Sequence, residues 1–151
     1  MTWGKARTTT TNHVIQSAVQ GLSTAIFPNL TNSESTGLSN AITAFNADGF
    51  ALGDWSPLNA SGQNFVSWNW KANGAGSANT DGDINSTVSA NTTSGFSIVK
   101  YTGNGSSSAT VGHGLNSAVK MVICKDLTNG EGWKVWHTDM TAGYTMSLHT
   151  T

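Results

Sequence analysis

The chain has 151 residues, of which 10% are charged, and a formal net charge of −1 at pH 7. This length fits one domain with its own core, and the near-neutral charge excludes the basic stripe that a nucleic-acid backbone requires. Serine, threonine, asparagine and glycine supply the polarity, so we expect strands and turns rather than a long amphipathic helix.

Neither the apolar runs nor the N-terminus indicates passage through a membrane. No run approaches the roughly 20 apolar residues that a membrane-spanning helix needs. Residues 1–7 lack the apolar segment of a signal peptide. Release by cell lysis, as for parts of a virion, therefore suits a protein that works outside cells, and we expect no membrane insertion.

Short runs of alternating apolar and polar residues, bounded by turn-forming residues, predict antiparallel strands along the whole chain. The turn that ends in Asp48-Gly49 predicts a hairpin. Within the strands we expect Trp68, Trp70 and Trp133 to fill the core. The predicted strands are 41–45, 50–52, 65–70, 84–90, 96–101, 119–124 and 133–137.

The run Val119–Cys124 has the apolar character of a central strand. Cys124 is the only cysteine, which excludes an internal disulfide and a thiolate metal cluster. We expect its side chain to be a small buried hydrophobe.

Residues 71–95 form the most polar stretch of the sequence. Its first half has the composition of a flexible linker. Its second half contains the predicted strand Ile84–Ala90, which we expect to form a hairpin with residues 96–101 through a turn at 91–95.

The two ends of the chain carry an internal repeat. Residues 1–17 align without gaps with residues 121–137, which pairs Met1 with Met121, Lys5 with Lys125, Ile15 with Val135 and Ser17 with His137. Residues 24–31 and 144–151 match as one further apolar strand. Identity is low, but strand, loop and strand recur in the same order, so the chain begins part-way into one repeat and stops at a similar phase of the next.

Two sets of motifs carry a family resemblance. The first set is GFSIVKYTGNG at residues 95–105, followed by VGHGL, KMVICK and GWKVWH. The second set is AFNADGF at residues 44–50 and NASGQNFVSWNWKA at residues 59–72. Together they resemble the two halves of a repeated unit in tail, fibre and other structural proteins of marine phages, over residues 3 to about 148.

This resemblance implies a concanavalin A-like fold, in which two antiparallel sheets form a jelly-roll sandwich. The halves stand in reverse order here: residues 1–72 are the second half of one unit, 73–94 are a polar linker with one strand, and 95–151 are the first half of the next unit. We therefore expect an all-β sandwich that is either permuted or spans two tandem units, with one folded domain overall as an alternative.

The order of the halves leaves the tail from Met121 without an assigned partner. If Met1 is the native start, the N-terminal strands can close a sandwich with residues 95–115, and the tail is free to pair with a neighbouring chain by strand addition. A tail folded into the sheets of its own chain would contradict this hypothesis.

No residue pattern predicts catalysis or metal binding. The acidic residues lie in or beside predicted turns, so the paired carboxylates of a glycosidase are not expected. The four histidines show no zinc-binding spacing, and Asp81-Gly82-Asp83 lacks the further oxygen ligands of a calcium loop. We expect no enzyme activity, no metal and no cofactor.

The tryptophans carry the only binding signal, because aromatic rings stack on the apolar faces of sugars. Trp55 lies in a predicted loop beside Asp54, and these two residues are the best candidates for a glycan or surface contact. Trp136 alternates away from Trp133 and Val135, so we expect it to face outward towards a glycan or another subunit.

Composition, repeat and resemblance together predict a structural or adhesive protein of the phage virion, as a fibre, tail or capsid-decorating component. Its expected partners are other copies of itself, other virion proteins and host-surface glycans. The alternative is a carbohydrate-binding module of a secreted bacterial protein. A polysaccharide-cleaving enzyme of the same fold would need an inward-facing carboxylate pair.

Overall fold

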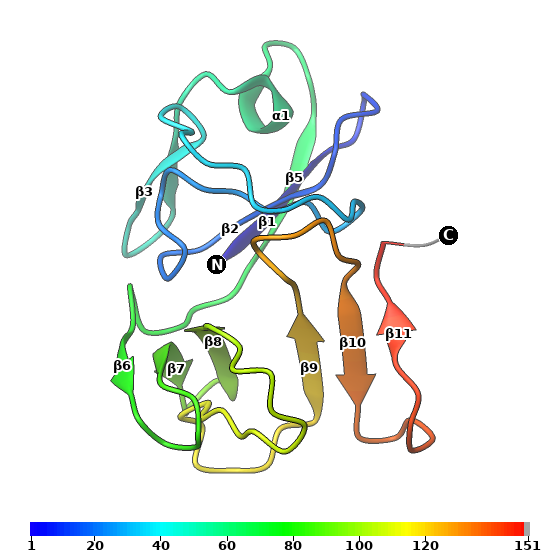
Figure 1. The fold of residues 1–151 in the computed structure, drawn as a ribbon. Coiled ribbons are helices and arrows are strands. Elements are labelled where there is room, and N and C mark those ends of the chain that lie inside the picture. The colour runs from blue at the N-terminus through cyan, green and yellow to red at the C-terminus, as the bar shows by residue number, and fades with distance from the viewer. Residues whose placement is uncertain (150–151) are drawn as a thin grey trace.

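The computed structural model describes residues 1–149 and contains antiparallel strands with a single short helix, α1 (Ser56–Asn59) (Figure 1). The predicted all-β class is confirmed. The jelly-roll order of strands stays a prediction. The strands are β1 (Thr2–Ala6), β2 (Val14–Gln16), β3 (Ile42–Phe45), β4 (Phe50–Leu52), β5 (Phe65–Asn69), β6 (Ser77–Asn79), β7 (Ser86–Asn91), β8 (Phe96–Tyr101), β9 (Met121–Cys124), β10 (Lys134–His137) and β11 (Met146–Ser147).

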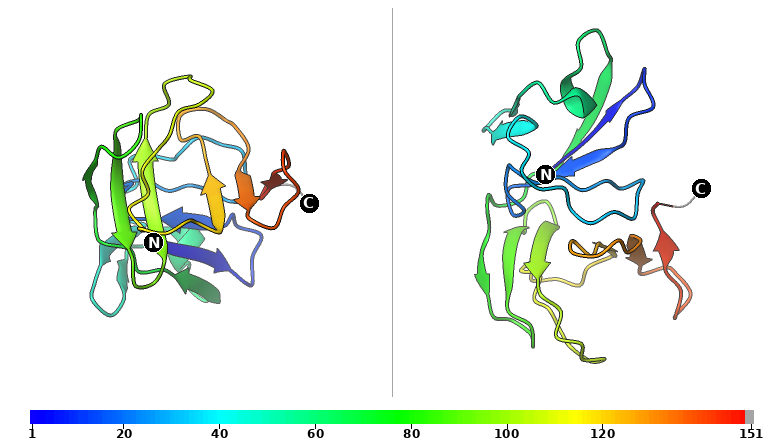
Figure 2. Two further views of the ribbon diagram at one scale, coloured as in Figure 1. Left: turned by 90° about the horizontal axis from the view of Figure 1, so that it is seen from below. Right: turned by 45° about the horizontal axis from the view of Figure 1, so that its top comes forward.

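The strands form stacked layers (Figures 1 and 2). A middle sheet has the order β2-β1-β5, and the hairpin β3-β4 lies with α1 above it. Below the middle sheet, the sheet β6-β7-β8 lies side by side with the sheet β9-β10-β11. We call these two sheets the lower layer, and we call β9-β10-β11 the tail sheet.

The upper core lies between the β3-β4 hairpin, α1 and the middle sheet. Its buried side chains come from β2, β3, α1 and the bridge at residue 25, and they are Val14, Ala25, Ile42 and Leu58. Gly4 permits this contact, because a Cβ at that position would lie 2.5 Å from Cδ2 of Leu58. The hairpin closes as the Asp48-Gly49 motif predicts, with the amide of Asn46 donating to the carbonyl of Gly49 at 2.8 Å.

The first half of the polar stretch at residues 73–94 is not a flexible linker, because it contains β6, while β7 and its antiparallel pairing with β8 confirm the strand and hairpin predicted for the second half. Ser89 of β7 is fully buried and its hydroxyl holds the stretch in place. The hydroxyl accepts the amide of Asn73 at 2.7 Å and donates to the carbonyl of Gly74 at 2.9 Å. The stretch has the composition of a linker because it is rich in small polar residues, whose side chains here form hydrogen bonds to the backbone.

Gln16 joins three segments from inside the upper core, where its side chain is fully buried. Its Nε2 donates to the carbonyls of Leu22 at 3.1 Å and Thr24 at 2.9 Å. Its Oε1 accepts the amide of Ile42 at 2.9 Å. One buried amide side chain therefore satisfies three backbone groups at the junction of β2, the following loop and β3.

We expect Gln16→Leu to lower the free energy of unfolding by about 3 kcal/mol, because a buried polar group without a partner costs roughly 1–3 kcal/mol. Urea unfolding followed by tryptophan fluorescence measures this loss. The matched control is Gln63→Leu, which removes only an exposed hydrogen bond to Thr8 and should cost less than about 1 kcal/mol. Equal losses in the two variants would contradict this role of Gln16.

Candidate interaction site on the tail sheet

The strand pairs of the tail sheet correspond to those of the N-terminal strand unit at an offset of 120 residues. In the first copy, β1 pairs with β2 so that Thr2, Trp3 and Gly4 face Gln16, Ile15 and Val14. In the second copy, β9 pairs with β10 so that Val122, Ile123 and Cys124 face Trp136, Val135 and Lys134. Each of these three pairs of the second copy is a pair of the first with 120 added to both residue numbers. The internal repeat predicted from the sequence is therefore also a structural repeat.

The third strand and the loops of the two copies also correspond at an offset of 120 residues. Ile15 bridges to Ile26 in the first copy, and Val135 pairs with Met146 in the second. The ammonium of Lys5 donates to the carbonyls of Ala6 and Thr9, and that of Lys125 donates to those of Asp126 and Asn129. Burial lowers the pKa of Lys125, against the opposing effect of the nearby carboxylates.

The two copies differ in what covers them. In the first copy, β5 pairs with the side of β1 that faces away from β2, and the β3-β4 hairpin covers the outer face of the sheet. Among residues 1–149, no strand pairs with the free side of β9, and no hairpin covers the outer face of the tail sheet. The site that we consider is this uncovered copy, with an outer face and an open edge.

The outer face of the tail sheet presents Val122 and Trp136 to solvent. They are direct cross-strand neighbours, and their exposed fractions are 44% and 41%. The outward orientation expected for Trp136 is confirmed. The other strand residues on this face are Cys124, Lys134 and Ser147, so the apolar strip lies towards one end of β9 and β10.

Several expectations for apolar residues in and beside this site were wrong. β9 is an edge strand rather than a central one, and Cys124 is exposed rather than buried. Trp68 and Trp70 are also exposed rather than in the core. Trp68 contacts Trp3 edge-on and Trp70 stacks on Phe96, so each ring packs on one aromatic neighbour and leaves much of its surface in solvent.

Trp133 is buried as expected, and it joins the two copies. Its ring lies with Ile15 and Ile26 in a second core, which we call the lower core, and only 4% of the residue is exposed. Its Nε1 donates to the carbonyls of Phe27 at 3.0 Å and Leu30 at 3.1 Å. The tail is therefore not surplus chain, as the strand-addition hypothesis assumed, because its inner face is part of the chain's own core.

The glycan candidates Asp54 and Trp55 lie at the start of α1, in the upper part of Figure 1 and away from β10. Trp55 is half-buried against the upper core. Asp54 is exposed and accepts a hydrogen bond from Nδ2 of Asn40 at 2.6 Å. The structure thus brings Asp54 and Trp55 next to each other but leaves Trp136 in another layer, and their role in binding stays a prediction.

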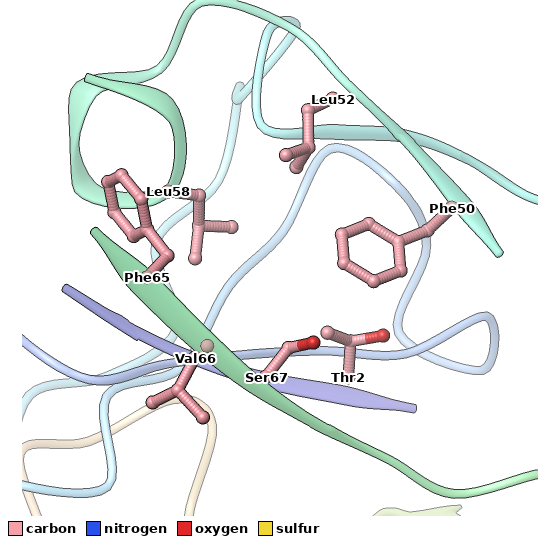
Figure 3. Close-up of a pocket in the computed structure, with 8 residues that line it drawn as sticks. Thr2, Phe50, Leu52, Leu58, Phe65, Val66 and Ser67 are labelled. Atoms are coloured by element: carbon pink, nitrogen blue, oxygen red, sulfur yellow. The ribbon is translucent and has the colours of Figure 1, made fainter. Parts of the chain in front are cut away.

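A small cavity of about 110 Å³ lies between the hairpin and the middle sheet (Figure 3). Its polar lining side chains are the hydroxyls of Thr2 and Ser67, and no ionisable side chain lines it. Ligand pockets are usually several times larger. The remaining lining residues are Gly4, Phe50, Leu52, Leu58, Phe65 and Val66.

Asp83 and His13 are ionisable residues of the described chain that have hydrogen-bond partners in other segments. The hydroxyl and the amide of Thr110 bond to the Asp83 carboxylate and lower its pKa. Burial lowers the pKa of His13, whose Nδ1 accepts the indole N–H of Trp3 at 3.1 Å. Within residues 1–149, no three His, Cys, Asp or Glu side chains gather in a way that could hold a metal ion.

Comparison with protein families gives one match. A family model described as a domain of unknown function, DUF7483, matches residues 1–151. The chain belongs to the DUF7483 family. The match includes both copies of the repeated strand unit and the segments between them. No curated protein and no solved structure matches the chain. Within residues 1–149 of this DUF7483 chain, no helix has the length and apolar character needed to span a membrane.

We expect Trp133→Phe to loosen the tail, because it leaves the two carbonyls at Phe27 and Leu30 without their donor. The expected loss in the free energy of unfolding is about 2 kcal/mol, with faster amide exchange in β10. Urea unfolding and hydrogen exchange measure the two effects. Trp55→Phe is the matched control, since the Trp55 ring packs half-buried in the other core. Amide exchange in β10 that is as slow in Trp133→Phe as in the natural chain would contradict this role of Trp133.

Proposed function

We propose that this chain is a structural and adhesive module of an extracellular assembly, in which the tail sheet is the contact surface. The setting that the sequence resemblance favours is a phage virion, where the module would serve in a fibre, a tail or the capsid decoration. The observation that carries the proposal is the apolar strip of Val122 and Trp136 on the uncovered face of the tail sheet.

The exposed apolar side chains of the described chain are concentrated in the tail. Six of its eleven exposed large hydrophobic residues lie between residues 121 and 146. Two of these residues, Val122 and Trp136, lie together on the outer face of the tail sheet, and apolar side chains that gather on one exposed surface usually mark a contact with another macromolecule. These six residues are Met121, Val122, Ile123, Trp136, Tyr144 and Met146.

Low charge supports an apolar mode of contact. Lys134 is the one charged side chain that the strands place on the outer face of the tail sheet. Burial of apolar surface, rather than ion pairing, would therefore stabilise the contact, and its strength should depend little on salt. The partners that fit this surface are other copies of the chain and other proteins of the assembly.

The alternative function is a carbohydrate-binding module. The observation in its favour is Trp136, whose ring is open to solvent on a sheet face, as a platform for a sugar ring requires. Asp54 supplies an exposed carboxylate that could orient sugar hydroxyls, but it lies just before α1, and α1 and β10, the strand of Trp136, are in different layers (Figure 1).

Sedimentation velocity over a wide range of protein concentration tests the proposed function. We expect concentration-dependent self-association, which Trp136→Ser weakens about tenfold or more, because a buried aromatic residue in an interface is worth about 1.4 kcal/mol or more. The matched control is Leu22→Ser, which removes an exposed apolar side chain outside the tail sheet and should leave association unchanged.

A glycan array separates the two functions. Saturable binding of a sugar by a chain that stays monomeric at all concentrations would contradict the proposed function and support the carbohydrate-binding module. Mass spectrometry of purified virions from the source of the sequence tests the location, and absence of the chain from particles would contradict the virion setting.

A further inference from the structure

We propose that the open edge of β9 accepts a β5-type strand from a second chain of this family, and that this strand enters the lower layer between β9 and β8. The proposal rests on the proposed function as an assembly module and names the partner of the tail sheet. Its basis is the structural repeat, because β1, the counterpart of β9, already holds such a strand.

The hydrogen-bonding phase of β1 is fixed by its contacts with β5. Met1 and Trp70 exchange both backbone hydrogen bonds, since the N-terminal amine donates to the carbonyl of Trp70 and the amide of Trp70 donates to the carbonyl of Met1, each at 2.9 Å. In an antiparallel pair such exchanges recur at every second residue. Trp3 and Lys5 therefore also turn their backbone groups towards β5.

The same phase leaves the counterparts of these residues open on β9. The amide of Thr138 donates to the carbonyl of Lys120, so Val122 and Cys124 turn their backbone groups towards β10. Met121, Ile123 and Lys125 turn theirs the other way. In the described part of the chain, no strand pairs with them on that side.

Two apolar side chains that point into the molecule are left half-exposed beside this edge. Ile123 is on the same face of the tail sheet as buried Val135, but 45% of it is exposed. Trp68 is on the same face of the middle sheet as Trp3, which packs into the lower core, but 47% of it is exposed. These side chains leave apolar surface on two layers that an incoming strand would cover.

The edge of β8 faces the same space. The two sheets of the lower layer are adjacent in both figures, and Figure 2 shows β8 and β9 pointing the same way. The hydroxyl of Tyr101, at the end of β8, contacts Sγ of Cys124 at 3.6 Å. This contact raises the pKa of the Tyr101 phenol. A strand antiparallel to β9 would also be antiparallel to β8 and would join the two sheets.

β9 carries no charge, proline or bulge that would block pairing at its edge. Its four residues, Met121–Cys124, include no charged residue and no proline, and its pairing with β10 has no bulge. Edge strands that must stay unpaired usually carry such features. The ammonium of the following residue, Lys125, is bonded to carbonyls of its own loop, as that of Lys5 is beside β5.

The register of the incoming strand follows from the pairing of β1 with β5. Trp3 faces Trp68 and Lys5 faces Val66 in the first copy. An offset of 120 places Ile123 opposite a tryptophan equivalent to Trp68, and Lys125 opposite a valine equivalent to Val66. The tryptophan would then cover the exposed side of Ile123.

The test uses a synthetic peptide with the sequence of residues 63–71, QNFVSWNWK, added to the full chain. We expect it to bind and to slow amide exchange at Met121, Ile123 and Lys125 by about tenfold or more. Amides of Val122 and Cys124 should not change, because β10 already bonds them. This alternation reports the edge and the register, and hydrogen exchange resolved by NMR measures it.

Two matched controls remove one backbone donor each. A peptide with a methyl group on the backbone nitrogen of Trp68 cannot donate to the carbonyl of Ile123, and we expect it not to bind. Ile123→Pro removes the outward N–H of β9 and keeps the bonds to β10, so it should abolish binding of the unmodified peptide. Ile123→Ala keeps that N–H and should bind within about tenfold of the natural chain.

Absence of binding, or protection at Trp3, at β8 alone or at the outer side of β5, would overturn the proposal. If Ile123→Pro fails to fold, the methylated peptide still decides the outcome. Failure here is distinct from failure of the proposed function. Peptide binding by a chain that does not self-associate supports the strand site alone, while self-association through Trp136 without peptide binding supports the assembly module alone.

Discussion

The burial of Trp133 between the two copies of the strand unit is the contact on which the architecture depends. Its indole lies against Ile15 and Ile26 and donates to two carbonyls of the segment after β2. This fixes the inner face of the tail sheet against the middle sheet. It also determines which surfaces of the tail are left over, because a sheet with one face buried still has an outer face and edges.

The differences between the two copies follow from this placement. Val14, in the upper core, corresponds to Lys134 on the open face, as expected where no hairpin covers the strand. Gln16, fully buried among backbone groups, corresponds to exposed Trp136. The first replacement suits solvent and the second does not. A repeat adapted only to exposure would have become polar at both positions, so the tryptophan points to a contact outside the chain.

Much of the fold could be predicted from local sequence. The Asp48-Gly49 hairpin, the alternation at residues 65–70 and 96–101 and the offset between the chain ends all correspond to observed elements. These signals are local or depend on self-similarity, and both are present in one sequence.

The errors have two physical causes. An apolar strand such as Met121–Cys124 has the same pattern whether its neighbour lies in the same chain or in another, so the sequence could not separate a central strand from an open edge. Trp68 was misplaced for the same reason. The polar segment at residues 73–76 was mistaken for a linker because the buried hydroxyl that holds it, on Ser89, lies many residues away.

Gly4 and Cys124 occupy equivalent positions in the two copies of the strand unit, and the second copy offers a site for chemical labelling there. Gly4 cannot carry a side chain, because Leu58 lies against its Cα, while the tail has no helix over the corresponding strand and places a free thiol there. The chain has only one cysteine. A thiol-reactive dye would therefore attach at a single known point, near the edges of β8 and β9. Its emission would report whether these edges are exposed to water or covered by a partner, and no engineered residue would be needed.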